Sequence, residues 1–304
     1  MARATRVAIG LPVKDGDNFL ADAIGSLLNQ TYEDFTLVIG DNCSTDGTEE
    51  ICRSAATEDK RVVYYRHEHD IGASANYTFV FERSSGSLFR WANHDDRWDS
   101  KHLETCVGAL DEDPEAILAC TGTVDIDADG ATIKQWPLMS GYESADPATR
   151  LAEALSQEET FPIFGLIRRT ALTRTQLQPP YAGSDRAMLA HLALLGRFVL
   201  IPEPLFLHRQ HPNRSIRSAR NREDRMNWWD PSGADRLVIP HVMLTRDYLR
   251  AIRSTPLTRT DRLRCLQVLS RDVLRRRRAL TVDTIGATRF WVVRKLRLLR
   301  NSSS

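Results

Sequence analysis

Apolar positions follow two alternating patterns in the first third of the chain. Short runs of consecutive apolar residues, which indicate buried strands, occur at 7–11, 35–39, 61–65 and 88–92. Between them, apolar residues recur every three or four positions, which indicates helices that pack one face on a sheet. The clearest of these stripes consists of Phe19, Leu20, Ala23, Ile24, Leu27 and Leu28. Strands that alternate with helices predict an α/β fold with a mostly parallel central sheet and helices on both faces.

The pattern becomes more mixed after residue 98. It predicts helices at 99–110, 147–155 and 184–195, and strands at 116–120, 198–201 and 205–208. Pro202-Glu203-Pro204 separates the last two strands, since proline interrupts strand pairing. Residues 124–130 begin like a calcium-binding loop, but Trp136 stands where that loop needs a bidentate Glu. We therefore predict a hairpin there, and helices from about residue 236 to the end.

The composition is that of a globular protein large enough to bury a core. The chain has 304 residues, of which 42% are hydrophobic and 27% are charged. Its five cysteines are scattered and never spaced as Cys-x-x-Cys, which argues against a disulfide framework or a thiolate zinc site. The N-terminus lacks a signal-peptide pattern, and no apolar run approaches the roughly 20 residues that span a bilayer. These features predict a cytoplasmic location.

The net charge of +1 conceals an uneven distribution of charge. Residues 246–304 contain 16 Lys and Arg but only 4 Asp and Glu, a net charge of +12, so the preceding residues carry −11. An acidic body therefore precedes a basic, helical C-terminal segment. Such a distribution indicates an anionic partner, a membrane surface, or a match between the two parts of the chain.

Three of the predicted strands are followed by loops that carry candidate binding residues. Pro12 and Val13 follow the first strand, Asp41 and Asn42 the second, and the run 93–96 the fourth. We expect these loops to form one site, because open α/β sheets bind ligands at the carboxyl ends of their parallel strands. Divalent cations such as Mg²⁺ bind one or two carboxylates together with substrate phosphates. The arrangement predicts a nucleotide whose base lies across the first two loops and whose diphosphate reaches the third through a metal.

The same loops contain features that are also found in other settings. The pair Asp95-Asp96 alone is equally consistent with solvated acids that open the helix at residue 99, since acids favour helix N-termini. The loop 40–48 is followed by no Gly-Lys-Ser/Thr, and no Gly-x-Gly-x-x-Gly follows the first strand. The site is therefore neither a Walker phosphate loop nor a dinucleotide fingerprint.

An ordered series of segments resembles the family 2 glycosyltransferases over residues 6–215. The segments are 9–12, 23–32, 40–48, 70–73, 95–96, 202–205 and 209–212. The resemblance implies a GT-A fold and inverting transfer of a sugar from a nucleoside-diphosphate-sugar to a hydroxyl-bearing acceptor. UDP- and dTDP-sugars are favoured as donors, and Mn²⁺ or Mg²⁺ as the metal. It also implies a nucleotide-binding half (1–98), an acceptor half (99–215) and a basic helical extension (216–304).

The resemblance assigns donor-binding roles by position. Asp41 falls where the family holds the nucleotide base, beside Pro12 and Val13, and Asn42 replaces a second Asp. The family's metal motif, commonly Asp-x-Asp-Asp, falls on residues 93–96.

Within that motif, Asn93 replaces the acid near the ribose, and His94 and Asp96 belong to the same substrate-binding loop. Asp95 takes the position of the metal ligand. Asp96 is expected to support the loop or a metal-bound water.

Further roles fall past the middle of the chain. Asp185 matches the family's general base, although Ser184 stands where Glu is common, and either residue is also a plausible helix cap. His211 matches a metal ligand, against the alternative of an ordinary loop residue. Arg209 or Arg214 is expected near the phosphates, because the leaving group's developing charge must be neutralised.

The basic helices and the function each allow an alternative. The helices either dock on the body or form a homo-oligomer, which we favour, or touch the inner face of a membrane. No recognition motif supports a nucleic-acid partner. The replacements at Asn42, Asn93 and Ser184 also leave a catalytically inactive nucleotide-sugar-binding module as the alternative function.

Overall fold

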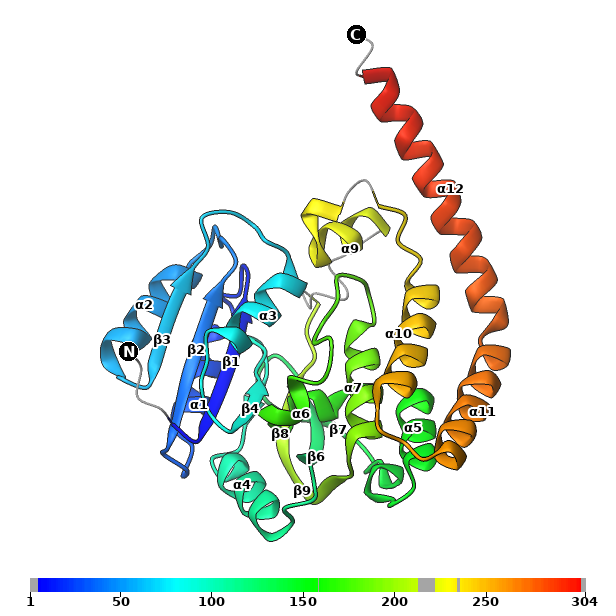
Figure 1. Cartoon of the computed structure of the whole chain (residues 1–304). Helices are drawn as coiled ribbons and strands as arrows, with labels where there is room; N and C mark the ends of the chain where they lie inside the picture. The colour runs from blue at the N-terminus through cyan, green and yellow to red at the C-terminus, as the bar shows by residue number, and fades with distance from the viewer. Residues whose placement is uncertain (1–4, 158, 213–221, 234–235, 302–304) are drawn as a thin grey trace.

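The computed structural model describes residues 5–157, 159–212, 222–233 and 236–301. One mixed sheet runs through it in the order β3-β2-β1-β4-β8-β6-β9-β5, and β7 pairs with β6 (Figure 1). β1–β4 are mutually parallel, as are β6 and β9, whereas β8 is antiparallel to both neighbours. The predicted α/β class with a mostly parallel sheet is thus confirmed. The strands are β1 (Val7–Val13), β2 (Phe35–Asp41), β3 (Val62–Arg66), β4 (Leu88–Trp91), β5 (Arg97–Trp98), β6 (Leu118–Ile126), β7 (Thr132–Gln135), β8 (Leu166–Arg168) and β9 (Phe198–Arg209).

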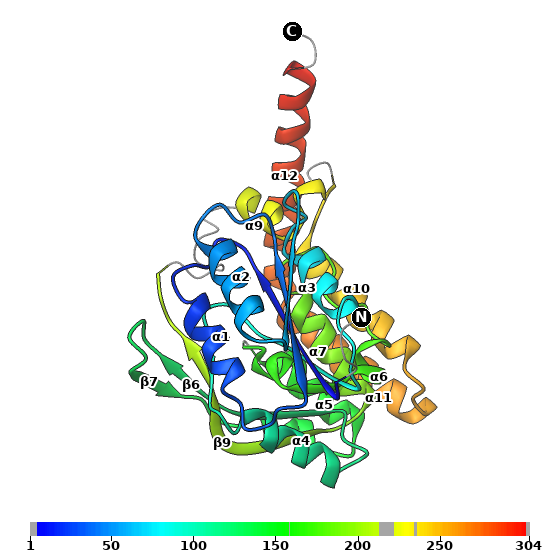
Figure 2. The same cartoon turned by 90° about the vertical axis from the view of Figure 1, so that its left-hand side faces the viewer.

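Helices cover both faces of the sheet. Figure 2 shows α1 and α2 on one side of β1–β3, and α3 and α7 on the other. The helices are α1 (Leu20–Leu28), α2 (Thr48–Glu58), α3 (Ala73–Glu82), α4 (His102–Glu112), α5 (Pro147–Ser156), α6 (Arg169–Leu172), α7 (Ser184–Leu195), α9 (Arg222–Trp229), α10 (Pro240–Ser254), α11 (Arg259–Arg275) and α12 (Arg277–Asn301). Two strands were not predicted, β5 and β8, because two or three residues are too short for a period to be read.

The end of the sheet differs from the prediction in one place. The expected break at Pro202–Pro204 is wrong, because β9 continues from Phe198 to Arg209. The register with β6 shifts between Thr121 and Thr123, so the prolines lie where the ladder is interrupted and no amide donor is needed. Gly122 permits this, since a Cβ there would lie 2.8 Å from the Pro202 carbonyl oxygen. The hairpin predicted at 124–130 is confirmed as β6–β7.

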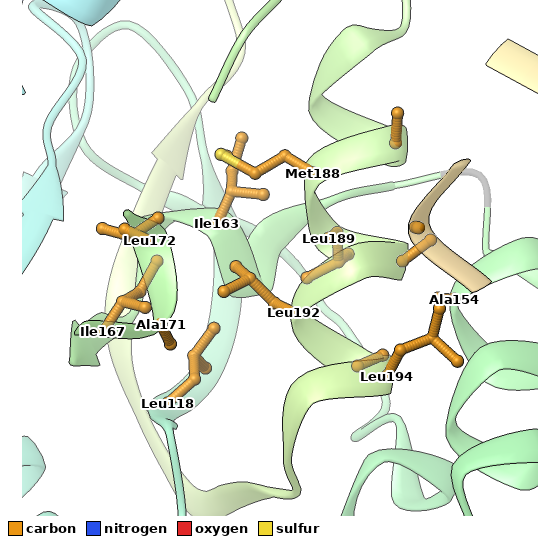
Figure 3. Close-up of a cluster of buried hydrophobic side chains, with 14 of the residues drawn as sticks. Leu118, Ala154, Ile163, Ile167, Ala171, Leu172, Met188, Leu189, Leu192 and Leu194 are labelled. Atoms are coloured by element: carbon orange, nitrogen blue, oxygen red, sulfur yellow. The ribbon is translucent and has the colours of Figure 1, made fainter. Parts of the chain in front are cut away.

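The position of α7 is fixed by an apolar core on one face of the sheet. Figure 3 shows Met188 directed toward Ile163, Leu192 toward the β6–β8 side, and Leu194 beside Ala154 of α5. All of these side chains are buried. The beginning of α7, which carries Asp185, is therefore anchored to the sheet by the rest of the helix.

The C-terminal helices extend the same core. Leu244, Tyr248 and Ile252 of α10 and Leu269 of α11 belong to the buried cluster that contains the α5 and α7 side chains. The hydroxyl of Tyr181 donates to Asp247 at 2.8 Å across this contact. The boundary expected at 215/216 lies outside the described residues. Among the described helices, none is both long enough and apolar enough to cross a membrane.

Candidate active site

The loops expected to converge do lie together. Val13 at the end of β1 is paired in register with Asp41 at the end of β2, and Gly10 of β1 with Trp91 at the end of β4. Parallel pairing therefore brings the loops after β1, β2 and β4 to one edge of the sheet. Pro12 and Val13 are buried there, and the Val13 carbonyl accepts from the Asn42 amide at 2.8 Å.

Asp41 is fully buried at this edge, and both of its oxygens are engaged. One accepts from the Ser44 amide at 2.9 Å, and the other from the Tyr64 hydroxyl at 2.8 Å. Burial, and next the bond to Asp41, raise the pKa of Tyr64. The Asp41 carboxylate thus holds the loop after β2 in shape, at the edge where a nucleotide base is expected to bind.

Asn42 has a structural reason to differ from the family's Asp. Its side-chain amide donates to Asp70 at 2.7 Å, and its oxygen accepts from the Ile71 amide at 2.8 Å. Lys14 forms an ion pair with the same Asp70. An aspartate at position 42 cannot donate to Asp70, so the amide is required to close the loop after β2 against the turn at 70–72.

The two acids after β4 are buried to different degrees and used differently. Asp96 is 1% exposed and accepts from the Arg209 amide and the Asn93 side-chain amide, both at 2.9 Å. Burial, and next the charge of Asp95, raise the pKa of Asp96. Asp95 is 8% exposed, and its Oδ2 lies 3.0 Å from Nε2 of His211. Asp96 therefore supports the loop, as expected, while Asp95 and His211 present one oxygen and one nitrogen together.

The start of α4 argues against a purely capping role for the acid pair. An acid pair that only opened a helix would cap α4, but the N-cap of α4 is Lys101 and no side chain caps it. His211 is 4% exposed, and its ring packs 4.7 Å from that of Phe19. Neither Asp95 nor His211 is thus an ordinary surface residue.

A phenol that the sequence did not single out lies among the acids. The Tyr77 hydroxyl donates to Asn93 Oδ1 at 2.9 Å, which directs the amide group of Asn93 toward Asp96. Burial, and then the charges of Asp95, Asp96 and Asp185, raise the pKa of Tyr77. Tyr77 was missed because it occupies an apolar stretch of α3 that predicts only packing.

Asp185 approaches the same place from the other half of the fold. It lies in the first turn of α7, and its Oδ2 accepts from the Thr160 hydroxyl at 2.7 Å. The alternative, that Ser184 or Asp185 caps α7, is not seen: the N-cap is Gly183, in the left-handed region at φ 88°, without a side-chain cap. Asp185 therefore has no capping role, and its charge, like those of Asp95 and Asp96, raises the pKa of Tyr77.

Arg209 takes a different place from the one predicted. It is 2% exposed, and its guanidinium donates to the carbonyls of Asp95, Asp127 and Ala128 and pairs with Asp22. These partners tie the acid pair to the β6–β7 hairpin and to α1. We assign Arg209 a positioning role in place of the expected phosphate contact.

The structure says less about the two remaining predicted residues, His94 and Arg214. His94 is partly exposed and lies so close to Gly16 that a Cβ there would be 2.6 Å from its ring. The loop after β1 thus leaves room for His94 at the site edge. Arg214 lies outside the described residues.

The donor set fits a divalent cation only if a substrate completes it. Within the described residues, no group of three or more His, Cys, Asp or Glu is arranged to hold a metal ion. Asp95 and His211 offer two ligands, and Mg²⁺ or Mn²⁺ bound through one or two protein groups commonly takes the rest from phosphates and water. The residues present therefore fit a diphosphate-bridged metal and not an all-protein cage.

Comparison with known proteins agrees with this geometry. A family model described as Glycosyl transferase family 2 matches residues 8–175. An uncharacterized glycosyltransferase of Rickettsia typhi is 30% identical over 116 residues, which cover 38% of this chain and 35% of that protein. The chain spans little more than a third of the length of the first curated relatives that it matches.

Solved structures share the fold at low identity. TarS of S. aureus in complex with UDP-GlcNAc has a TM-score of 0.70 at 14% identity, covering 93% of this chain and 79% of that one. The mannosyltransferase PcManGT of Pyrobaculum calidifontis, in complex with GDP-Man and Mn²⁺, has a TM-score of 0.59 at 15% identity, covering 99% and 80%. With more than half of its length matched by the family model, the chain belongs to glycosyl transferase family 2.

Proposed function

We propose that this protein is an inverting glycosyltransferase that moves a sugar from a nucleoside-diphosphate-sugar to a hydroxyl-bearing acceptor. The observation that carries the proposal is the pairing of Asp95 with His211 at 3.0 Å beside the buried Asp96, at the sheet edge where the loops after β1, β2 and β4 meet. The acceptor hydroxyl can attack the sugar only if the candidate base, Asp185, lies next to this donor site. UDP- and dTDP-sugars are the favoured donors. The relatives support nucleotide-sugar use, since TarS is solved with UDP-GlcNAc and PcManGT with GDP-Man.

Different residues bind the donor and activate the acceptor. The nucleotide base binds at the sheet edge formed by Pro12, Val13 and Asp41. The ribose binds beside Asn93 and His94. Asp185 accepts the proton of the acceptor hydroxyl as that oxygen attacks the anomeric carbon from the side opposite the bond to the nucleoside diphosphate, which breaks, so the configuration inverts.

Asp95 and His211 would hold the divalent cation. When bound, the metal supplies charge neutralisation for the departing diphosphate. The structures of PcManGT and of GalNAc-T7, both solved with Mn²⁺, support the choice of a divalent metal. We propose a cytoplasmic location, where nucleotide-sugars and reduced cysteines are both expected.

The test is thermal stabilisation by a panel of nucleoside diphosphates with Mn²⁺, with Mg²⁺ and with EDTA. A ligand at a hundred times its Kd stabilises the folded state by about 2.7 kcal/mol, enough for a clear shift of the melting temperature. We expect one nucleotide to stabilise the protein with metal and not with EDTA. Asp111→Ala is the matched control for Asp95→Ala. Asp111 pairs with Arg6 far from the site, so its loss should leave the nucleotide-induced shift of the melting temperature intact.

The alternative, an inactive nucleotide-sugar-binding module, remains distinguishable. It predicts the same metal-dependent shift with neither transfer nor hydrolysis of any bound donor. If no nucleotide stabilises the protein under any metal condition, both functions fail.

A further inference from the structure

The distal C-terminal helix presents an apolar face that no described part of the protein covers. Val282, Ile285, Val292 and Val293 of α12 are 72%, 64%, 42% and 43% exposed. Together with the exposed Arg278 and Arg289 they follow a spacing of three or four residues, with Val293 directly after Val292, so all six lie on one side of the helix. We call this set of six residues the outward face of α12.

The opposite side of α12 is attached to the body. Asp283 pairs with Arg222 of α9 and with His241 of α10, both at 3.0 Å, and Arg294 lies 3.6 Å from Glu223. Ala287 is buried between these contacts. The helix is thus docked along one side only, and Figure 1 shows its last turns continuing past the body.

The charge around the outward face is positive. All four aspartates of residues 246–304 are used internally: Asp247 by Tyr181, Asp261 by Thr258, Asp272 by Arg275 and Arg276, and Asp283 as described. The net charge of +12 in this segment already counts these four aspartates, none of which belongs to the outward face, whereas Arg278 and Arg289 do. This basic, partly apolar surface complements a partner that is anionic and has an apolar layer.

We propose that the outward face of α12 binds the surface of a membrane that contains anionic lipids. The valine and isoleucine side chains enter the boundary between headgroups and acyl chains. The long arginine side chains extend past them to the lipid phosphates. The sequence favoured docking or oligomerisation of the basic helices; α10 and α11 do dock on the body, whereas the outward face of α12 is left exposed.

Two other partners fit the face less well. A second copy of α12 would bring Arg278 and Arg289 of each helix to the seam, where like charges repel. A nucleic acid would satisfy the arginines but leave the valines and isoleucine against a polar backbone.

Through its docked side, α12 also lies next to α9, which borders the candidate site. Glu223 and Arg222 connect α12 to α9, and the Trp229 carbonyl of α9 would be 2.6 Å from a Cβ on Gly72. Gly72 belongs to the turn that Asn42 and Asp70 hold at the carboxyl edge of the sheet.

The experiment is flotation of the purified 304-residue chain with vesicles of phosphatidylcholine alone or mixed with phosphatidylglycerol. Each arginine near an anionic surface strengthens binding roughly fivefold. Arg278→Glu/Arg289→Glu should thus lower binding to the mixed vesicles by more than tenfold, and Ile285→Asn/Val293→Asn should lower it without a change of charge. Lys60→Glu/Lys101→Glu is the matched control, because it makes the same charge change at exposed positions of the body.

Several results would overturn the proposal. One is equal binding to neutral and mixed vesicles, and another is an equal loss in the Lys60/Lys101 control. A third is a dimer in lipid-free solution that Ile285→Asn/Val293→Asn converts to monomer, which would assign the face to a second copy. Circular dichroism and the nucleotide-induced thermal shift, measured on the same variants, separate loss of lipid binding from misfolding and from failure of the proposed catalytic function.

Discussion

Asn42→Asp tests whether the amide at this position is required by its neighbour Asp70. The substitution removes a hydrogen bond to a charged group, which contributes about 1.5 to 3 kcal/mol, and places two carboxylates about 3 Å apart. Two such charges repel by roughly 1.5 kcal/mol in bulk water and by about 5.5 kcal/mol at an effective dielectric constant of 20.

The expected cost lies at the lower end of this range. The Asp70 side chain is 37% exposed and paired with Lys14, so solvent and the ammonium group weaken the repulsion. We expect Asn42→Asp to lower the free energy of unfolding by about 2 to 3 kcal/mol at pH 8. The two carboxylates raise the folded-state pKa of the pair above the unfolded value. The cost is therefore small below about pH 4 and grows as the pH rises through the folded-state pKa.

The assay is urea unfolding of wild type and variants at pH 4.5 and pH 8, in EDTA. Asn18→Asp is the control, because it adds the same charge at an exposed loop position. Asn42→Asp/Asp70→Asn should recover about half of the loss, since the like-charge contact is gone. A variant as stable as wild type at pH 8, or a loss that does not change with pH, would refute the reasoning.

Four further predictions follow from the site and the sheet. Asp95→Ala should abolish metal-dependent turnover and the metal-dependent nucleotide shift without lowering the melting temperature; full activity with the same metal response would contradict its role. Asp185→Asn should bind donor as wild type does but lose transfer, and a lowered donor affinity at an unchanged rate per bound donor would exclude the base. Tyr77→Phe should cost about 1 kcal/mol in urea unfolding by freeing the Asn93 amide, so no change would argue against that bond. Gly122→Val should cost about 2 to 3 kcal/mol, because the Cβ would meet backbone oxygens of Pro202 and Glu203, and a stable variant would show that β9 can move aside.

The sequence predicted those parts of the protein that depend on local periodicity. The parallel strands β1–β4, the helices between them and the loops at their carboxyl ends could be placed because each buried run is long enough to show its period. The strand β8 could not, since its three residues pair with β4 and β6 from distant parts of the chain. β9 was divided wrongly because the bulge that tolerates its prolines lies in β6.

The site was predicted as a set of residues but not as a network. Asp95, His211 and Asp185 were proposed by position, whereas the link through Tyr77 and Asn93 depends on the packing of α3 against β4. For Arg209, the sequence identified the residue but not the groups that it bonds. Its charge suggested a phosphate contact, but the carbonyls that it bonds come from loops that only the folded sheet brings together.

The core that α10 and α11 share with α5 and α7 has a consequence for how this chain can be recombined. Leu244, Tyr248 and Ile252 cover α7 side chains that would otherwise face water, so a chain ending near residue 215 would expose part of its own interior. Grafting the first 215 residues onto a foreign C-terminal segment would require that segment to reproduce the same apolar surface. We therefore expect the family-like region and its basic C-terminal extension to be kept together, both in evolution and in engineered chimaeras.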